Sequence, residues 1–278
     1  MKMKIMITSK DKEIFTKILL VKILALIFLF LVRPPTTRIS DVEMYYNLTE
    51  NINETFKPPG TPLEKISLYG PNSFKPPGWV FFLYPFYVIY PNWIFWGLLF
   101  SFVFSTLALY FLYLSTNEKI MWLFFFYPYF LYHSNFPLEV SIFSFLVVLT
   151  FYFLKKNNFL SNLLSNISSF FRPEGVLISL YILLKKVEMK NILLFVITTC
   201  AVLYIYAYSY VFLNYHFKPP VIAYPRLLIP FLIPLFVEYQ KFFTKHFWKI
   251  MIMWFILGAS IGFFKVFYIW SFSSEPQF

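Results

Sequence analysis

Long apolar runs separated by short lysine-bearing breaks dominate this chain. One run covers residues 14–32, and from residue 79 onward apolar segments follow one another with short interruptions. Hydrophobic residues make up 59% of the chain and charged residues 13%, whereas soluble chains are about a quarter charged. A core in water cannot bury this much apolar surface, so part of the solvent must be lipid. The pattern predicts an all-α, polytopic transmembrane bundle of about eight to ten membrane segments, one domain over residues 1–278.

Length decides which runs can cross a bilayer, since a spanning helix needs about 20 apolar residues. Three runs, 79–90, 160–171 and 174–184, are too short. We expect them to be half-helices or interfacial segments that line a cavity. The runs expected to span are 14–32, 93–115, 120–136, 137–154, 191–213, 225–238 and 249–270.

The net charge of +11 has two interpretations. It would suggest nucleic-acid binding in a soluble protein, but here the basic residues cluster between apolar runs. That placement favours the positive-inside rule and predicts no nucleic-acid partner. One topology puts the N-terminus and every basic cluster in the cytoplasm, if 79–90 dips in without crossing and 160–184 is a hairpin. It makes the protein a multi-pass integral membrane protein whose proline-rich 33–78 loop is external or lumenal; a cleaved signal peptide is the alternative for 14–32.

Asp41 and Glu43 are the first candidate site residues, because they lie early in the 33–78 loop, close to the membrane surface. One carboxylate could accept a proton from an attacking hydroxyl. Both could hold a divalent cation, Mg²⁺ or Mn²⁺, through hard oxygen ligands. The alternative is an acidic pair that is simply solvated in a loop.

Further candidates combine one acid with several cations. Glu139 starts an apolar run, where an ionisable residue is costly and therefore a functional candidate; an acid that meets the helix dipole is the alternative. Arg172 and Arg226 carry guanidinium groups suited to phosphate, unless Arg172 pairs with Glu174 or snorkels to the interface. Lys75 lies in one of three Phe-Lys-Pro-Pro copies, which supply positive charge or are helix-stopping loop punctuation.

The predicted topology places all of these candidates on the external side of the membrane. Carboxylates and cations that face one cavity suit transfer chemistry on an anionic lipid. The chain has no glycine-rich dinucleotide loop, P-loop, HExxH motif or serine nucleophile elbow, so a nucleotide-driven reaction is not indicated. The candidates are Asp41, Glu43, Lys75, Glu139, Arg172 and Arg226.

In order and spacing, these motifs resemble the polytopic glycosyltransferases of the GT-C class. The first likeness is the early acidic motif Asp41-Val42-Glu43, and the second is the end of the loop, Phe74-Lys75-Pro76-Pro77-Gly78-Trp79. The third is the middle of the chain, Pro137-Leu138-Glu139 followed by Phe171-Arg172-Pro173-Glu174-Gly175. This stretch is similar to the GPI mannosyltransferase type that adds the second mannose.

The resemblance covers roughly residues 14–235 and implies an enzyme, a hexosyltransferase. It would move a sugar such as mannose, with inversion, from a polyprenyl (dolichyl) phosphate donor to a glycan, glycolipid or protein acceptor. It implies catalytic roles for Asp41 and Glu43. Lys75, Arg172 and Arg226 would then bind the donor phosphate, with Glu139 as a second acidic site.

A transporter or lipid flippase is the second hypothesis. Broken helices occur there as well, and such a protein should carry charges at mid-membrane on several spans and an inverted repeat. The sequence indicates neither feature. A membrane scaffold protein without chemistry is the third hypothesis.

Overall fold

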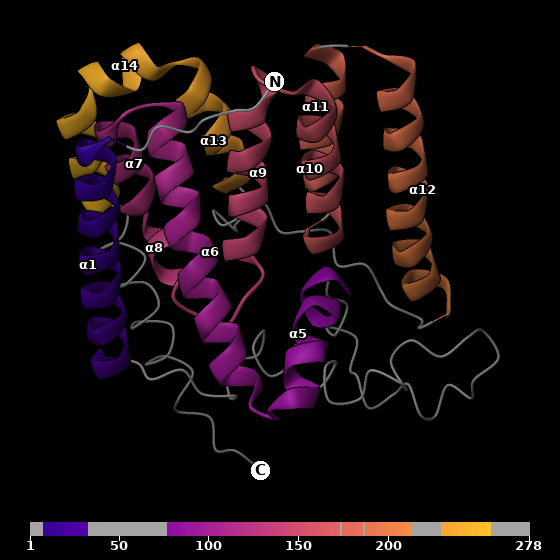
Figure 1. The fold of residues 1–278 in the computed structure, drawn as a ribbon, viewed down its shortest axis with the longest axis horizontal. Coiled ribbons are helices and arrows are strands. Elements are labelled where there is room, and N and C mark those ends of the chain that lie inside the picture. The colour runs from indigo at the N-terminus through magenta and orange to yellow at the C-terminus, as the bar shows by residue number, and fades with distance from the viewer. Residues whose placement is uncertain (1–7, 33–76, 173, 186, 213–228, 257–278) are drawn as a thin grey trace, which may run out of the picture.

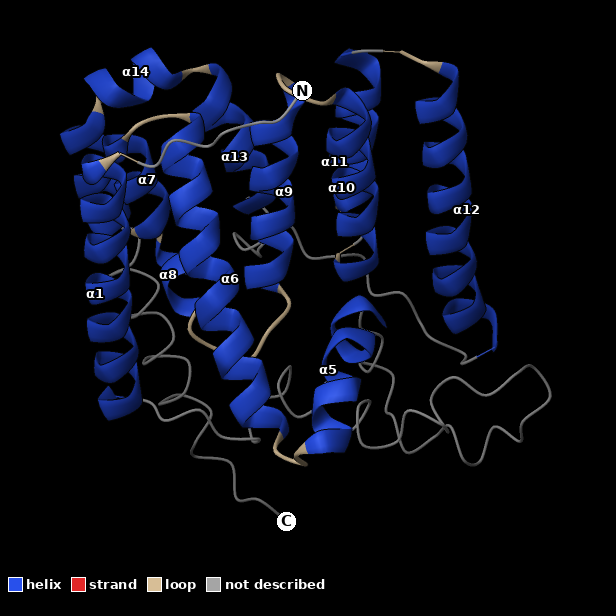
Figure 2. Cartoon of the chain, in the orientation of Figure 1, coloured by secondary structure: helices blue, strands red, loops and turns tan. Residues whose placement is uncertain are grey.

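The structure, a computed structural model, describes residues 8–32, 77–172, 174–185, 187–212 and 229–256. Over these ranges the chain is helical and contains no strand (Figure 2), which confirms the all-α prediction. A further helical segment, Phe247–Ile256, follows the last labelled helix. The labelled helices are α1 (Ser9–Val32), α5 (Pro77–Ile89), α6 (Trp93–Ser115), α7 (Glu118–Phe125), α8 (Pro128–His133), α9 (Val140–Leu154), α10 (Asn158–Phe171), α11 (Gly175–Lys185), α12 (Met189–Phe212), α13 (Ile229–Glu238) and α14 (Gln240–Lys245).

The longer helices run side by side in one general direction (Figure 1). At the centre α6 packs against α9, and α1 packs against α6. On the other side of α9 lies α10, which also contacts α11 and α12. Short α5 contacts both α6 and α10, and Figure 1 shows it beneath the lower ends of α10 and α11.

Side-chain contacts identify the helix ends that share one end of the bundle, at the top of Figure 1. Tyr113 in the last turn of α6 donates to Asp11 in the first turn of α1 over 3.2 Å. Lys185, the last residue of α11, pairs with Glu238, the last residue of α13, at 3.2 Å. We call this the lysine-rich end. Its helix ends and connecting turns carry Lys10, Lys12, Lys119, Lys155, Lys156, Lys185, Lys190, Lys241 and Lys245.

One helix of the described ranges, α6, is both long enough and apolar enough to cross a membrane. Its bounds coincide with the predicted span 93–115. The three runs predicted to be short are confirmed as short helices, α5, α10 and α11.

Two predicted spans are wrong in length. Residues 120–136 do not form one helix, because α7 ends at Phe125 and α8 begins at Pro128. Proline lacks the backbone N–H that a helix interior uses and disfavours a helical conformation at the residue before it, but it fits the first helical position. The predicted span 137–154 begins three residues late, at Val140, since Pro137 belongs to the loop before it. The described part of 225–238 is α13, with Pro234 inside it.

Asparagine side chains start three of the helices. Asn92, Asn117 and Asn157 precede α6, α7 and α10 and accept a hydrogen bond from the backbone N–H three residues on, over 3.0, 3.1 and 3.0 Å. Such caps satisfy backbone donors that have no partner inside the helix. The start of α10, on which much of the site depends, is therefore set locally.

Candidate functional site

A non-helical loop lies in the interior between α8 and α9. Its residues, Ser134–Glu139, are all buried. Buried backbone groups must find hydrogen-bond partners, because an unpaired one costs about as much as a lost hydrogen bond. We call this segment the 134–139 loop, and the side chains that satisfy it come from three other helices.

Lys22 of α1 is the first of these side chains. It is 0% exposed. Its Nζ donates to Asn135 Oδ1 over 2.8 Å, to Ser134 Oγ over 3.2 Å and to Ser134 O over 3.4 Å. Three oxygen acceptors thus replace the water that the ammonium loses, which ties the middle of α1 to the start of the 134–139 loop.

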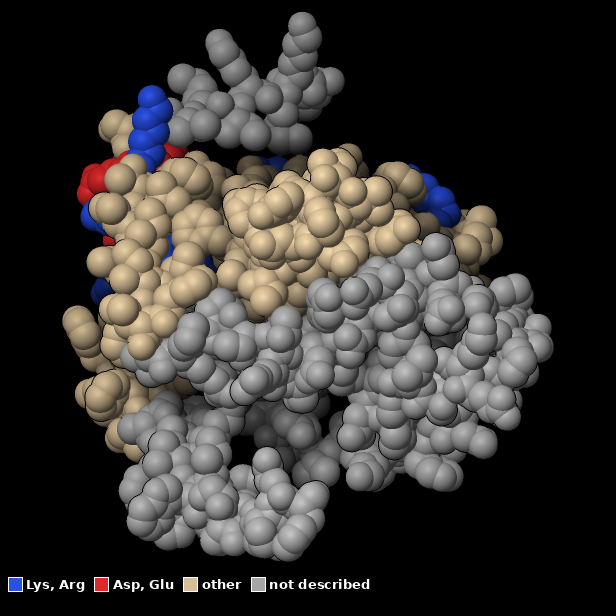
Figure 3. All heavy atoms as spheres, turned by 90° about the horizontal axis from the view of Figure 1, so that it is seen from below, with Lys and Arg blue, Asp and Glu red and all other residues tan. Residues whose placement is uncertain are grey.

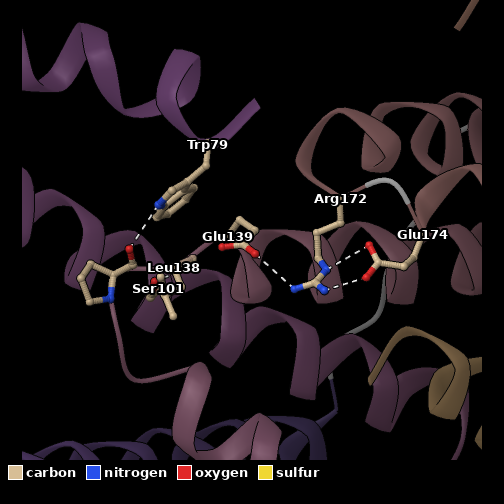
Figure 4. A network of polar contacts seen from close by, with 7 residues as sticks. Trp79, Ser101, Leu138, Glu139, Arg172 and Glu174 are labelled. Atoms are coloured by element: carbon tan, nitrogen blue, oxygen red, sulfur yellow. Dashed lines mark hydrogen bonds and ion pairs between the residues drawn. The ribbon is translucent and has the colours of Figure 1, made fainter. Parts of the chain in front are cut away.

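Trp79 of α5 and Ser101 of α6 hold the other half of the 134–139 loop (Figure 4). Trp79 Nε1 donates to Pro137 O over 3.3 Å, and Ser101 Oγ donates to Leu138 O over 3.3 Å. The loop also lies hard against α6, where a Cβ on Gly97 would overlap Pro137 Cβ. Only glycine allows this approach of helix and loop.

Glu139, the last residue of the 134–139 loop, belongs to a buried ion cluster with Arg172 and Glu174. Arg172 Nη1 donates to Glu139 Oε1 over 3.1 Å. The same guanidinium holds Glu174 at two points, Nη2 to Oε1 at 2.7 Å and Nε to Oε2 at 3.3 Å. The side chains of Arg172, Glu139 and Glu174 are 8%, 10% and 15% exposed. Figure 4 shows the guanidinium between the two carboxylates, and we call these three residues the ion cluster.

Helix ends explain why the charges lie where they do. Glu139 immediately precedes α9 and Glu174 immediately precedes α11, whereas Arg172 is the C-cap of α10. Carboxylates are favoured near helix N-termini and cations near helix C-termini. Each charge therefore complements the dipole of its own helix. Gly175 permits the tight start of α11, because a Cβ there would come 2.6 Å from Ser169 Cα.

The ion cluster lies partway along the bundle and not at its end. Both α9 and α10 reach the lysine-rich end, but they have 15 and 14 residues against 23 in α6, which makes them about 12 Å shorter at 1.5 Å per residue. Figure 1 shows the lower ends of α9, α10 and α11 well above those of α1 and α6. Seen from below, the described surface that is visible carries few charged groups, and these lie mostly toward its edge (Figure 3).

The sequence placed Glu139 and Arg172 on the same side of the membrane, and in the structure both lie at helix ends away from the lysine-rich end. The structure brings them together, and the predicted pairing of Arg172 with Glu174 is present. Nε, Nη1 and Nη2 of Arg172 each donate to a carboxylate, so a donor phosphate would have to displace a carboxylate from the guanidinium. The formal charge of the cluster is −1, which does not favour an anion.

The remaining predicted site residues, Asp41, Glu43, Lys75 and Arg226, lie outside the described residues. So do the predicted metal ligands, because these were Asp41 and Glu43. In the described ranges no group of three or more His, Cys, Asp and Glu side chains is placed to hold a metal ion. Glu139 and Glu174 share Arg172 and do not form such a group.

Sequence reasoning missed three residues that build the site: Lys22, Trp79 and Ser101. Lys22 interrupts the apolar run 14–32, and an isolated lysine inside such a run is the signal that could have identified it. Its position also corrects the view that charges are confined to one surface, because Lys22 is buried near the middle of α1. Trp79 and Ser101 carry no comparable signal, since both residue types are common in apolar helices.

Comparison with known protein families, with characterised proteins and with solved structures finds no match to this chain.

Proposed function

We propose that this protein is a multi-pass membrane glycosyltransferase that transfers a hexose from a polyprenyl phosphate donor to a hydroxyl acceptor. The observation that carries the proposal is the buried ion cluster of Arg172, Glu139 and Glu174, where three short helices end inside the bundle. Ionisable groups at such depth are expensive and mark functional sites by default. Charged residues at the ends of short helices inside an apolar bundle are typical of a membrane cavity that takes a polar group, and Lys75 and Arg226, not the ion cluster, would contact the phosphate.

In the proposed reaction the acceptor hydroxyl attacks the anomeric carbon of the donor. A C–O bond to the acceptor forms while the bond to the phosphate oxygen breaks from the opposite face, which inverts the anomeric centre. Asp41 takes the hydroxyl proton, with Glu43 beside it, and polyprenyl phosphate leaves as the anion. General-base help of this kind contributes about 10²–10⁴-fold, and bringing the two substrates together supplies much of the remainder.

Lys75 and Arg226 are the proposed cations for the leaving phosphate, whose growing charge needs preorganised partners. Arg172 would act through the fold, because its nitrogens hold Glu139 and Glu174. A divalent cation, Mg²⁺ or Mn²⁺, on Asp41 and Glu43 is the alternative source of positive charge. The acceptor is a glycan, a glycolipid or a protein.

The proposed topology has a cytoplasmic N-terminus and an external or lumenal 33–78 loop. The gathering of lysines at one end of the bundle supports it, since cytoplasmic segments are enriched in Lys and Arg. Exposed apolar side chains along α1 and α12, such as Leu24 and Leu193, support contact with lipid.

One assay tests the proposal directly. Purified protein in lipid vesicles is incubated with polyprenyl phosphate carrying a radiolabelled hexose, and the labelled product is separated from the donor. We expect enzyme-dependent product with wild-type protein and at least a hundredfold loss with Asp41→Asn. Asp11→Asn, at the lysine-rich end, is the matched control and should retain activity. Near wild-type transfer by Asp41→Asn would remove the base assignment.

Transport of a polyprenyl-linked lipid without covalent change is the second candidate. Buried charges on separate elements favour it: Lys22 of α1, and Glu139 with Arg172 around α9 and α10. Charged groups at such depth also line transport paths. In the same vesicles, movement of the labelled donor between leaflets without a new product would establish transport and exclude transfer.

A further inference from the structure

A row of asparagines runs along α10. Asn158, Asn162 and Asn166 are four residues apart and therefore lie on one face, with about 6 Å between successive members. Asn162 and Asn166 are 0% and 2% exposed. Their amide nitrogens donate to backbone oxygens four residues earlier in α10, over 3.0 and 2.7 Å. In all three residues the side-chain oxygen Oδ1 is buried and has no hydrogen-bond partner among the described residues.

A fourth asparagine lies across from this row, on α12. Asn191 is 0% exposed, and neither its Oδ1 nor its Nδ2 has a partner in the described ranges. α12 stands at the edge of the bundle and contacts α10 and α11, so its buried side faces them. Both α10 and α12 start at the lysine-rich end, where Asn158 Nδ2 donates to Glu188 Oε1 over 3.2 Å. Counted from that bond along the two helices, Asn162 lies four residues beyond Asn158 and Asn191 three residues beyond Glu188, so we infer that Asn162 and Asn191 lie at a similar level.

If no water reached these buried amides, their unpaired polar atoms would reduce the stability of the fold. A buried polar group without a partner costs about 1–3 kcal/mol, and native interiors meet this cost with ordered water. Direct pairing of Asn191 with Asn162 would still leave the oxygens of Asn158 and Asn166 without donors. Water supplies donors to all of them.

The asparagine row extends from the lysine-rich end toward the ion cluster. It starts beside Glu188 and Lys190 at the lysine-rich end, and these two residues form an ion pair of 3.1 Å. Six residues beyond Asn166 lies Arg172, the C-cap of α10 and the cation of the ion cluster. From Asn158 to Asn166 the row covers about 12 Å, and Arg172 lies about 9 Å further along the helix, so the row leads from the lysine-rich end toward the cluster.

We propose that the seam between α10 and α12, formed by Asn158, Asn162, Asn166 and Asn191, holds a file of ordered water. This water enters at the lysine-rich end and solvates the ion cluster, whose formal charge of −1 has no second cation within it. The seam gives Glu139 and Glu174 contact with solvent at the lysine-rich end of the bundle. This inference stands apart from the proposed sugar transfer.

Thiol reactivity with Ag⁺, a probe close to water in size, tests the seam in the full-length purified protein. All variants carry Cys200→Ser, because Cys200 is an exposed free thiol. Asn162→Cys places a thiol in the seam. Ser161→Cys is the matched control, since Ser161 is also 0% exposed but faces α9, where its Oγ donates to Thr150 O over 2.8 Å. We expect Ag⁺ to modify Asn162→Cys at least tenfold faster than Ser161→Cys.

A blocking experiment tests the direction of entry. Asn162→Leu should slow the reaction of Asn166→Cys at least tenfold, because it fills the seam between that thiol and the lysine-rich end. Asn166→Leu should leave the reaction of Asn162→Cys within twofold. Asn162→Met serves as the block if Asn162→Leu fails to elute as a single species.

Each other outcome would overturn the inference. Equal rates for Asn162→Cys and Ser161→Cys, whether fast or slow, would mean that the seam is no wetter than the rest of the interior. A block that works only in the reverse order would mean that water reaches the seam from the ion cluster and not from the lysine-rich end.

Discussion

Arg172 Nη1 lies 3.1 Å from Glu139 Oε1, although 33 positions separate the two residues in the chain. The ion pair joins the end of α10 to the start of α9, while Glu174 occupies the rest of the same guanidinium. One cation thus serves two buried carboxylates. Because the cluster holds one cation and two carboxylates, removing the arginine should lower the free energy of unfolding more than removing one acid.

The first prediction concerns that inequality. Arg172→Met leaves two buried carboxylates without a cation and should lower the free energy of unfolding by about 3–5 kcal/mol. Glu139→Gln leaves a balanced Arg172–Glu174 pair and should cost about 1 kcal/mol. Tryptophan fluorescence during denaturant unfolding in detergent measures both.

The exposed ion pair of Lys185 and Glu238 provides the control. Its side chains are 45% and 40% exposed, so Lys185→Met should change stability by less than about 1 kcal/mol. An Arg172→Met variant as stable as Lys185→Met would contradict the unequal roles of the ion cluster.

The second prediction concerns the tether from α1 to the 134–139 loop. Lys22→Met removes three hydrogen bonds, and each contributes about 0.5–1.5 kcal/mol to the stability of the loop in its observed conformation. We expect amide hydrogen exchange in the 134–139 loop to become at least tenfold faster. Lys17→Met is the matched control, because Lys17 lies on the same helix but is 48% exposed. Unchanged exchange in Lys22→Met would show that the loop does not depend on the tether.

The third prediction concerns the contact of α6 with Pro137. By helix propensity alone, Gly97→Ala should stabilise α6 by about 1 kcal/mol. The new Cβ would overlap Pro137, and overpacking typically costs about 1–3 kcal/mol, so we expect net destabilisation and faster exchange in the 134–139 loop. Ser115→Ala, at the other end of α6, removes only a bond to the helix's own backbone and should be nearly neutral. A stabilised Gly97→Ala would mean that the loop moves aside freely.

The fourth prediction is a pH dependence at the start of α1, ahead of the apolar run 14–32. The backbone N–H and then the hydroxyl of Thr8, at 2.8 and 2.7 Å from Asp11 Oδ2, lower the pKa of Asp11 below its ordinary value of 3.8. A carboxyl with a lowered pKa stabilises the fold fully above pH 3.8, and the effect disappears as the pH falls through the folded-state pKa. The difference in unfolding midpoint between wild type and Asp11→Asn should therefore be constant near neutral pH and shrink below pH 3.8.

Thr8→Val is the control for this titration, because it removes the Thr8 hydroxyl, one of the two Thr8 groups that donate to Asp11 Oδ2. In that background the Asp11→Asn difference should be smaller at neutral pH. A difference that grows on acidification would reverse the sign and refute the assignment.

The helices themselves were largely predictable from sequence. Apolar runs predicted α6 and the three short helices, and the asparagine caps of α6, α7 and α10 act through hydrogen bonds that span three residues. The two spans predicted with the wrong length both contain a proline, Pro128 or Pro137. Counting apolar residues ignored the backbone N–H that proline lacks.

Within the site, distance along the chain separates what could be predicted from what could not. The Arg172–Glu174 pair spans two residues, and the sequence offered it as an alternative to phosphate binding. The pairing of Arg172 with Glu139 could not be specified in advance, because it depends on how α9 and α10 pack. The tether from Lys22 to Asn135 crosses 113 positions, so an apolar run with one lysine in it did not predict its partner.

By itself, the sequence determined that this chain is helical, that several of its helices are short, and where its lysines gather. Those properties follow from local hydropathy, capping and proline placement, which act within a few residues. Only the tertiary structure decided that the 134–139 loop is buried and that Glu139 and Arg172 meet partway along the bundle. Helices of unequal length share one end of the bundle, so the shorter ones end in the interior. Buried charges at those ends need partners of opposite charge, and the packing of α9 against α10 supplies them.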